Sequence, residues 1–196
     1  MQQRSEETRA NILDAAVRRF ALSGFNAASV DEICSDAGVS KGAFYHHFSS
    51  KQALFMALLE GWLKTIDQSL EGLRAASVPE TFVRMTGLLP AVFAAADSQL
   101  PLMLEFWLQA SRDETVWQSA IAPYRHYHQV FAKLVADGIA EGSLIEMDPE
   151  AAARVLVSMV IGLIFQGVFD PQGADWPQVA EHSMKILMNG MVKDPA

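Results

Sequence analysis

Cysteine, secretory segments and long apolar runs are what this sequence has least of. Its 196 residues include one cysteine, Cys34, which excludes an intramolecular disulfide and a multi-cysteine metal site. The first nine residues, MQQRSEETR, are polar and charged, unlike a secretory signal. The longest apolar stretch, residues 155–169, is 15 residues long and contains Ser158 and Gln166, which we interpret as too short for a membrane span. We therefore expect a cytoplasmic protein, with Cys34 as a small buried apolar residue rather than a redox sensor.

The patterns of common catalytic and metal sites are absent as well. The chain has no phosphate-cradling glycine loop, no nucleophile elbow and no Cys/His pair in a recognisable catalytic frame. His46 and His47 are neighbours, and His126 and His128 are two residues apart, so neither pair has the i, i+4 spacing of a helical metal pair. We expect no cofactor and no metal site, and a helical enzyme has no supporting set of residues.

Positive charge is scarce, but its distribution matters more than its total. The formal net charge is −8. Residues 1–52 hold six Lys or Arg and six Asp or Glu, whereas residues 53–196 hold nine and seventeen. The acidic surplus lies entirely in the second part, so the first part could still bind nucleic acid. A neutral domain has little long-range attraction to DNA, and its affinity would rest on local contacts and dimerisation.

Apolar residues recur at helical spacing along the whole chain, and no strand-like alternation is present. The pattern predicts an all-α protein of about nine helices. We expect Ser5 to cap the first helix, Gly24 to end it, and Ser49 to Gln52 to form the capping box of a helix of about 25 residues. Later helices are expected from Pro79, from a cap at Asp97 or Ser98 with Pro101 at the helix start, over 113–141, over 149–169 after an Asp148 cap, and from Asp175.

Residues 29–52, SVDEICSDAGVSKGAFYHHFSSKQ, are the most informative stretch. Ser29 with Glu32 makes a capping box for one short helix. Gly38 supplies a backbone position that tolerates positive φ, and Ser40 caps the next helix almost at once. The turn is therefore three or four residues long, as a helix-turn-helix requires.

The second of these helices carries side chains suited to DNA. Lys41 can reach guanine acceptors or a phosphate, Gly42 permits close approach of the backbone, and Tyr45 offers a hydroxyl to a phosphate. Phe44 and Phe48 are four residues apart and are expected to anchor the helix on its other side. The alternative from spacing alone is a generic capped helical hairpin with no DNA function.

Residues 15–55 resemble the N-terminal domain of the tetracycline-repressor (TetR) family of bacterial transcriptional regulators. The resemblance implies that Lys41, Gly42, Tyr45 and His46 face the bases, and that Ser29, His47 and Lys51 contact phosphates. Asp31 is the one acidic residue near that face. The matching positions are Phe20, Gly24-Phe25, Ser29-Val30, Ile33, Ala37 to Gly42, Phe44-Tyr45, His47-Phe48 and Ser50-Lys51. The full predicted DNA-binding set is Ser29, Val30, Ser40, Lys41, Gly42, Tyr45, His46, His47 and Lys51.

The helix at 149–169 is apolar nearly all the way round, which predicts burial on several sides. We expect it and the last helix to pair with their copies in a second subunit as a four-helix bundle, and the TetR resemblance implies the same homodimer. The alternative is that this helix is the core of a monomer.

Aromatic and methionine residues with a few polar neighbours are concentrated in the second part of the chain, as in a cavity for a small apolar ligand. Each residue alone is better explained as plain core. The resemblance adds that family members commonly release DNA when a small molecule binds this part; the identity of the small-molecule effector does not follow from the sequence. The predicted ligand-binding residues are Trp62, Met103, Phe106, Trp107, Gln109, Trp117, Tyr127, His128 and Phe165.

Together these features predict a helix-turn-helix DNA-binding domain at 1–52 and a ligand-binding and dimerisation domain at 53–196. The predicted function is a ligand-responsive homodimeric repressor of a near-palindromic double-stranded DNA operator. The alternative is a helical ligand-binding or interaction protein that has lost DNA binding.

Overall fold

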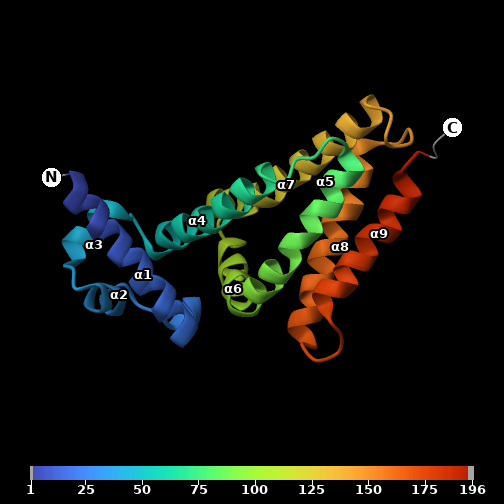
Figure 1. The fold of residues 1–196 in the computed structure, drawn as a ribbon. Helices are drawn as coiled ribbons and strands as arrows, with labels where there is room; N and C mark the ends of the chain where they lie inside the picture. The colour runs from blue at the N-terminus through green and yellow to red at the C-terminus, as the bar shows by residue number, and fades with distance from the viewer. Residues whose placement is uncertain (1, 194–196) are drawn as a thin grey trace. The chain divides into compact units, whose positions relative to one another are not determined.

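The computed structural model describes residues 2–193, with only the backbone described at residues 2, 3, 97 and 98. Within that range the chain folds into nine α-helices and one short 3-10 turn, and its only β-type pairing is a single bridge between Leu144 and Val192 (Figure 1). The all-α prediction is confirmed. The helices are α1 (Gln2–Ala27), α2 (Val30–Ala37), α3 (Lys41–His47), α4 (Lys51–Glu71), α5 (Val78–Met85), α6 (Leu89–Ala110), α7 (Glu114–Ala140), α8 (Pro149–Phe169) and α9 (Trp176–Met191), with the 3-10 turn η1 at Thr86–Leu88.

Side-chain caps explain where the later helices begin. Asp148 accepts a hydrogen bond from the Glu150 N–H, and Asp175 accepts one from the Gln178 N–H, so both expected caps are confirmed. A proline follows each cap within the first helical turn, where a missing N–H costs no hydrogen bond.

Three boundaries near the N-terminus differ from the prediction. Helix α1 already begins at Gln2, so Ser5 is not its cap. Gly24 does break α1, with φ 77° and ψ 168°, but helical backbone resumes through Ala27. At α4 the cap is Ser50 rather than Ser49: its Oγ accepts from the Ala53 N–H at 3.0 Å, and the helix has 21 residues.

The predicted helix start at Asp97 or Ser98 is wrong, because α6 runs through both positions. The preceding helix α5 ends at Met85, and Pro90 lies in the first turn of α6 directly after η1. Pro101 lies inside α6 and leaves one helical carbonyl without its N–H partner, yet the helix continues. Leu100 and Leu102 on either side of Pro101 are both buried.

By contacts, the chain forms two compact units. The first comprises residues 1–65 and 98–120, and the second comprises 66–97 and 121–196. Helices α4, α6 and α7 therefore each contribute residues to both units. The boundary at 52/53 stays a prediction about function, whereas the unit that contains the helix-turn-helix also includes the second half of α6.

Aromatic rings hold the first unit together. Phe55 of α4 stacks on Phe106 of α6 with ring centroids 4.5 Å apart, and Phe25 of α1 meets both rings edge-on at 5.2 and 5.5 Å. All three side chains are fully buried. This cluster fixes the residue 98–110 part of α6 against α1 and α4.

Helices α8 and α9 leave apolar side chains uncovered in the second unit. Val155 and Ile161 of α8 are 54% and 39% exposed, and Ile186 of α9 is 71% exposed. The argument that 155–169 is too short to span a membrane was wrong, because α8 has 21 residues and is long and apolar enough by composition. A single helix of this kind is weak support for a membrane span, since helices covered by protein partners pass the same test.

Candidate nucleic-acid interface

The start of α2 is held by the predicted capping box, which is confirmed. The Glu32 N–H donates to Ser29 Oγ at 3.2 Å, and the Ser29 N–H donates back to Glu32 Oε2 at 2.9 Å. Hydrogen bonds from the Ser29 hydroxyl and N–H lower the pKa of Glu32. The negative charge thus sits at the N-terminal end of α2, where the helix dipole favours it.

The turn between α2 and α3 has only residues 38–40. Gly38 adopts the left-handed conformation, with φ 66° and ψ 33°. Its N–H donates to the Ser35 carbonyl, and the Val39 N–H donates to the Cys34 carbonyl at 3.0 Å, which closes α2 as a Schellman motif. Ser40 Oγ then accepts from the Ala43 N–H and begins α3, as predicted.

Helix α3 has a buried side and an exposed side. Phe44 and Phe48 are 0% and 4% exposed, with their rings 5.9 Å apart, and they anchor the helix as expected. The predicted base-facing residues all lie on the exposed side of the helix. These are Lys41, Gly42, Tyr45 and His46, and the neighbouring Ser29 and Ser40 are exposed too.

Two electrostatic features tune this surface. The Lys41 ammonium lies 2.6 Å from a carboxylate oxygen of Asp31, and both side chains are more than half exposed. His47 lies beside His46, and desolvation, then the charges of His46 and Arg9, lower its pKa. The free protein therefore presents one paired cation and an imidazole that favours its neutral form.

Lys51 is engaged elsewhere than predicted. Its ammonium donates to three backbone carbonyls at the end of α1, those of Phe25 (2.6 Å), Asn26 (3.2 Å) and Ala28 (2.8 Å). The same ammonium lies 4.6 Å from the centre of the Phe25 ring. All three N–H donors are used in this conformation, so the phosphate contact of Lys51 stays a prediction, one that its side chain could fulfil only by leaving these carbonyls.

Sequence reasoning missed Arg19. Its guanidinium donates to both carboxylate oxygens of Asp36, at 2.9 and 2.8 Å, and also reaches Glu32 at 3.5 Å. This bidentate pair ties α1 to α2. The partners are 17 residues apart in the chain, and no local pattern links them.

The predicted ligand-binding residues are divided between the two units. Five of them pack in the core of the first unit, and the sixth member there, Gln109, is exposed. His128, in the second unit, is buried and faces Glu150 through both ring nitrogens, each 3.2 Å from an oxygen. Burial, then the Asp67 carboxylate, raise the pKa of Tyr127. The five core members are Trp62, Met103, Phe106, Trp107 and Trp117, and Tyr127, His128 and Phe165 belong to the second unit.

Trp107 has one feature that its neighbours lack. Its indole Nε1 is buried and has no hydrogen-bond acceptor, alone among the buried side-chain nitrogen and oxygen atoms of the described residues. Buried polar groups normally have partners, so this orphaned N–H marks a place where an acceptor is missing.

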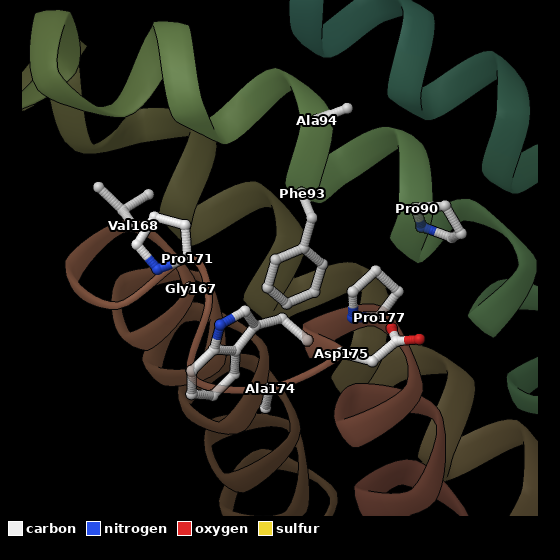
Figure 2. A pocket seen from close by; sticks show the side chains of 10 residues that line it. Pro90, Phe93, Ala94, Gly167, Val168, Pro171, Ala174, Asp175 and Pro177 are labelled. Atoms are coloured by element: carbon white, nitrogen blue, oxygen red, sulfur yellow. The ribbon is translucent and has the colours of Figure 1, made fainter.

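Described residues of the second unit line at least two hollows. The larger, of about 350 Å³, lies between the start of α6, the end of α8 and the start of α9. Figure 2 shows the Phe93 ring there near the rings of Pro171 and Pro177. Trp176 also lines this hollow. The smaller, of about 200 Å³, is lined by residues such as Asp67, Met85 and His126. None of the nine predicted ligand-binding residues lines either hollow.

Two sequence families match the chain. Residues 12–58 match the bacterial regulatory proteins of the tetR family, and residues 84–189 match the C-terminal domain of BetI-type transcriptional repressors. The uncharacterized HTH-type transcriptional regulator YfiR of Bacillus subtilis is 28% identical over 196 residues, which cover 96% of this chain and 94% of YfiR.

Solved structures share the fold. A transcriptional regulator from Saccharomonospora viridis in complex with choline has a TM-score of 0.77 at 21% identity, covering 96% of this chain and 99% of that one. The regulator FadR of Bacillus subtilis in complex with stearoyl-CoA has a TM-score of 0.75 at 19% identity, covering 92% and 98%. With the helix-turn-helix built as described and both halves matched, the chain belongs to the TetR family of transcriptional regulators, which are DNA-binding proteins and not enzymes.

Proposed function

We propose that this protein is a homodimeric repressor that leaves a near-palindromic operator when a small effector binds. The observation that carries the proposal is α3: a short helix, anchored by two buried phenylalanines, that presents Lys41, Gly42 and Tyr45 on its exposed side. A helix of this kind places its N-terminal residues against base edges in the major groove. Because a transcriptional regulator binds DNA, we expect the protein to be located in the cytoplasm.

The uncovered faces of α8 and α9 support the dimer. Val155, Ile161 and Ile186 are large apolar side chains that a lone chain leaves exposed to water. Covering them with the same helices of a second copy would bury a self-complementary surface. Two copies of α3 would then read two half-sites, and an inverted repeat would match the two-fold symmetry.

The orphaned Trp107 N–H supports an effector that carries an acceptor oxygen. Trp107 packs against the core of the first unit, as Trp62, Met103 and Trp117 also do. An apolar molecule with a carbonyl or hydroxyl oxygen could supply the missing acceptor there. The structural relatives bind molecules as different as choline and stearoyl-CoA, so relationship alone does not choose the chemistry.

The DNA part is tested by selecting bound duplexes from a random pool with the purified protein at fixed salt. We expect an inverted repeat, bound by a dimer. A matched selection with Tyr45→Ala, which leaves the buried side of α3 intact, should recover far less DNA. No enrichment by the wild type at low salt would favour a helical ligand-binding protein that has lost DNA binding.

The effector part is tested with pairs of small aromatic compounds that differ only in an acceptor oxygen, such as acetophenone and ethylbenzene. We expect release of the selected duplex by the oxygenated member of a pair at lower concentration. Trp107→Phe keeps the ring but removes the N–H, so it should erase that difference. If Trp107→Phe preserves the difference, the hydrogen bond to Trp107 is wrong.

A further inference from the structure

A carboxylate of α6 reaches the end of α1. The Asn26 backbone N–H donates to Glu105 Oε2 at 3.1 Å, across 79 residues of sequence. At Gly24 a Cβ atom would lie 2.8 Å from the other carboxylate oxygen, closer than such atoms approach in practice. The glycine therefore does two things: it adopts φ 77°, and it makes room for Glu105.

Lys51 of α4 binds the backbone carbonyls of the same segment. The ammonium takes the carbonyls of residues 25, 26 and 28, while Glu105 takes an N–H between them. Burial lowers the pKa of Lys51, and the negative charge of Glu105 opposes that shift. We call Glu105, Lys51 and residues 24–28 the α1 clamp.

The position of the clamp gives it influence over the reader helix. Residue 28 is followed directly by Ser29, the cap of α2, so the backbone that the clamp fixes leads straight into the helix-turn-helix. Helix α6 contributes residues 89–97 to one compact unit and 98–110 to the other. Glu105 lies in the 98–110 part, which belongs to the same compact unit as the helix-turn-helix.

We propose that Glu105 is a positioning residue: through the α1 clamp it orients the helix-turn-helix and so sets its affinity for DNA. The proposal rests on the DNA-binding function proposed above. Glu105 does not touch DNA in this scheme, and the closed clamp is the binding-competent arrangement. The adjacent Phe106 already anchors α6 by stacking on Phe55, so the carboxylate is not needed to hold the helix in the core.

The test compares Glu105→Ala, Glu105→Gln and the control Glu60→Gln, an exposed glutamate of α4 in the same unit. Amide hydrogen exchange is followed by NMR at Asn26 and along α2, and duplex affinity is measured at fixed salt. For Glu105→Ala we expect faster exchange at both places and about tenfold weaker DNA binding, the scale of one charge-assisted hydrogen bond. Glu105→Gln keeps an acceptor but loses the charge, so it should fall between Glu105→Ala and the wild type, and Glu60→Gln should match the wild type.

Three results would overturn the proposal. The first is unchanged DNA affinity in Glu105→Ala, and the second is faster exchange confined to Asn26. The third is loss of affinity that only parallels a lower melting temperature, because that indicates general destabilisation. If the wild type binds no duplex, the proposed function fails, but exchange along α2 still decides whether Glu105 positions the helix-turn-helix.

Gly24→Ala probes the close approach in a second way. The added methyl group collides with the Glu105 carboxylate, and the positive φ adds strain that does not depend on Glu105. We expect Gly24→Ala to weaken DNA binding more in the wild type than in Glu105→Ala, since the second background has no carboxylate to displace. Equal losses in both backgrounds would show that the approach of Glu105 to Gly24 has no effect on binding.

Discussion

Helix α3 and helix α8 are opposite kinds of element, and the contrast explains how this protein is built. Helix α3 has seven residues, a side-chain cap, a buried aromatic anchor and an exposed side of polar groups, so it is complete within one chain. Helix α8 has three times as many residues, is apolar nearly all round, and leaves large side chains such as Val155 exposed. We propose that the exposed side of α3 contacts DNA and that the uncovered side chains of α8 are covered by a second copy of the chain.

Two lysines show the same contrast between an exposed group and one bound to the protein. Lys41 and Lys51 both looked like DNA contacts in the sequence. Lys41 is exposed and held only by the exposed Asp31, a pair that water screens well. Lys51 is partly buried on three carbonyls, so Lys51→Ala is expected to loosen the first unit as well as weaken DNA binding.

The largest effect is expected inside α3 itself. Phe44→Ala should lower the free energy of unfolding by about 3–5 kcal/mol, because it empties a fully buried aromatic site. Its neighbour Tyr45 is 54% exposed, and Tyr45→Ala should change stability by only about 0.5 kcal/mol while weakening DNA binding. Urea denaturation checks both, and equal losses of stability would contradict the two-sided description of α3.

The α8–α9 surface should control assembly rather than folding. Ile186→Asp places a charge on the uncovered face of α9, and we expect a monomer whose operator affinity falls about a hundredfold, since linked half-sites no longer cooperate. Ile145→Asp is the matched control, because Ile145 is 42% exposed but lies in the connection before α8. Sedimentation velocity reports the subunit number. A monomeric wild type would refute the dimer.

On the DNA surface, Lys41→Ala should relax base preference, by about 1–3 kcal/mol at the contacted base pair. Tyr45→Phe removes only a hydroxyl expected at a phosphate, so it should weaken binding to all sequences alike. Competition binding with single-base variants of the selected duplex separates the two. If Lys41→Ala leaves base preference as it was, Lys41 does not read bases.

The smallest effect concerns the partner of Lys41. Asp31→Asn frees the ammonium and removes a negative charge beside the expected phosphates, so binding should tighten about two- to fivefold for every duplex. Asp14→Asn removes the same charge from an exposed site of α1 and serves as the control. Equal gains in both variants would assign the effect to net charge rather than to the pair with Lys41.

Local chemistry was legible in the sequence alone. The caps at Ser29, Ser40 and Asp148 and the left-handed Gly38 were all predicted, because each is satisfied by atoms within about four residues. The prediction of Ser49 as the cap of α4 was wrong for a local reason. Ser49 and Ser50 are equally good caps by residue type, and only the course of the backbone selects Ser50.

Tertiary structure decided what depends on distant partners. The bond of Glu105 to Asn26, the pairing of Arg19 with Asp36, and the capture of Lys51 by the end of α1 join residues 17 to 79 positions apart. Composition also does not tell which aromatic residues lie in the same unit. The nine predicted ligand-binding residues therefore prove to be divided between the two units. Periodicity reports which face of a helix is apolar, but which neighbour covers that face, or leaves it for a second subunit, is settled only when the chain has folded.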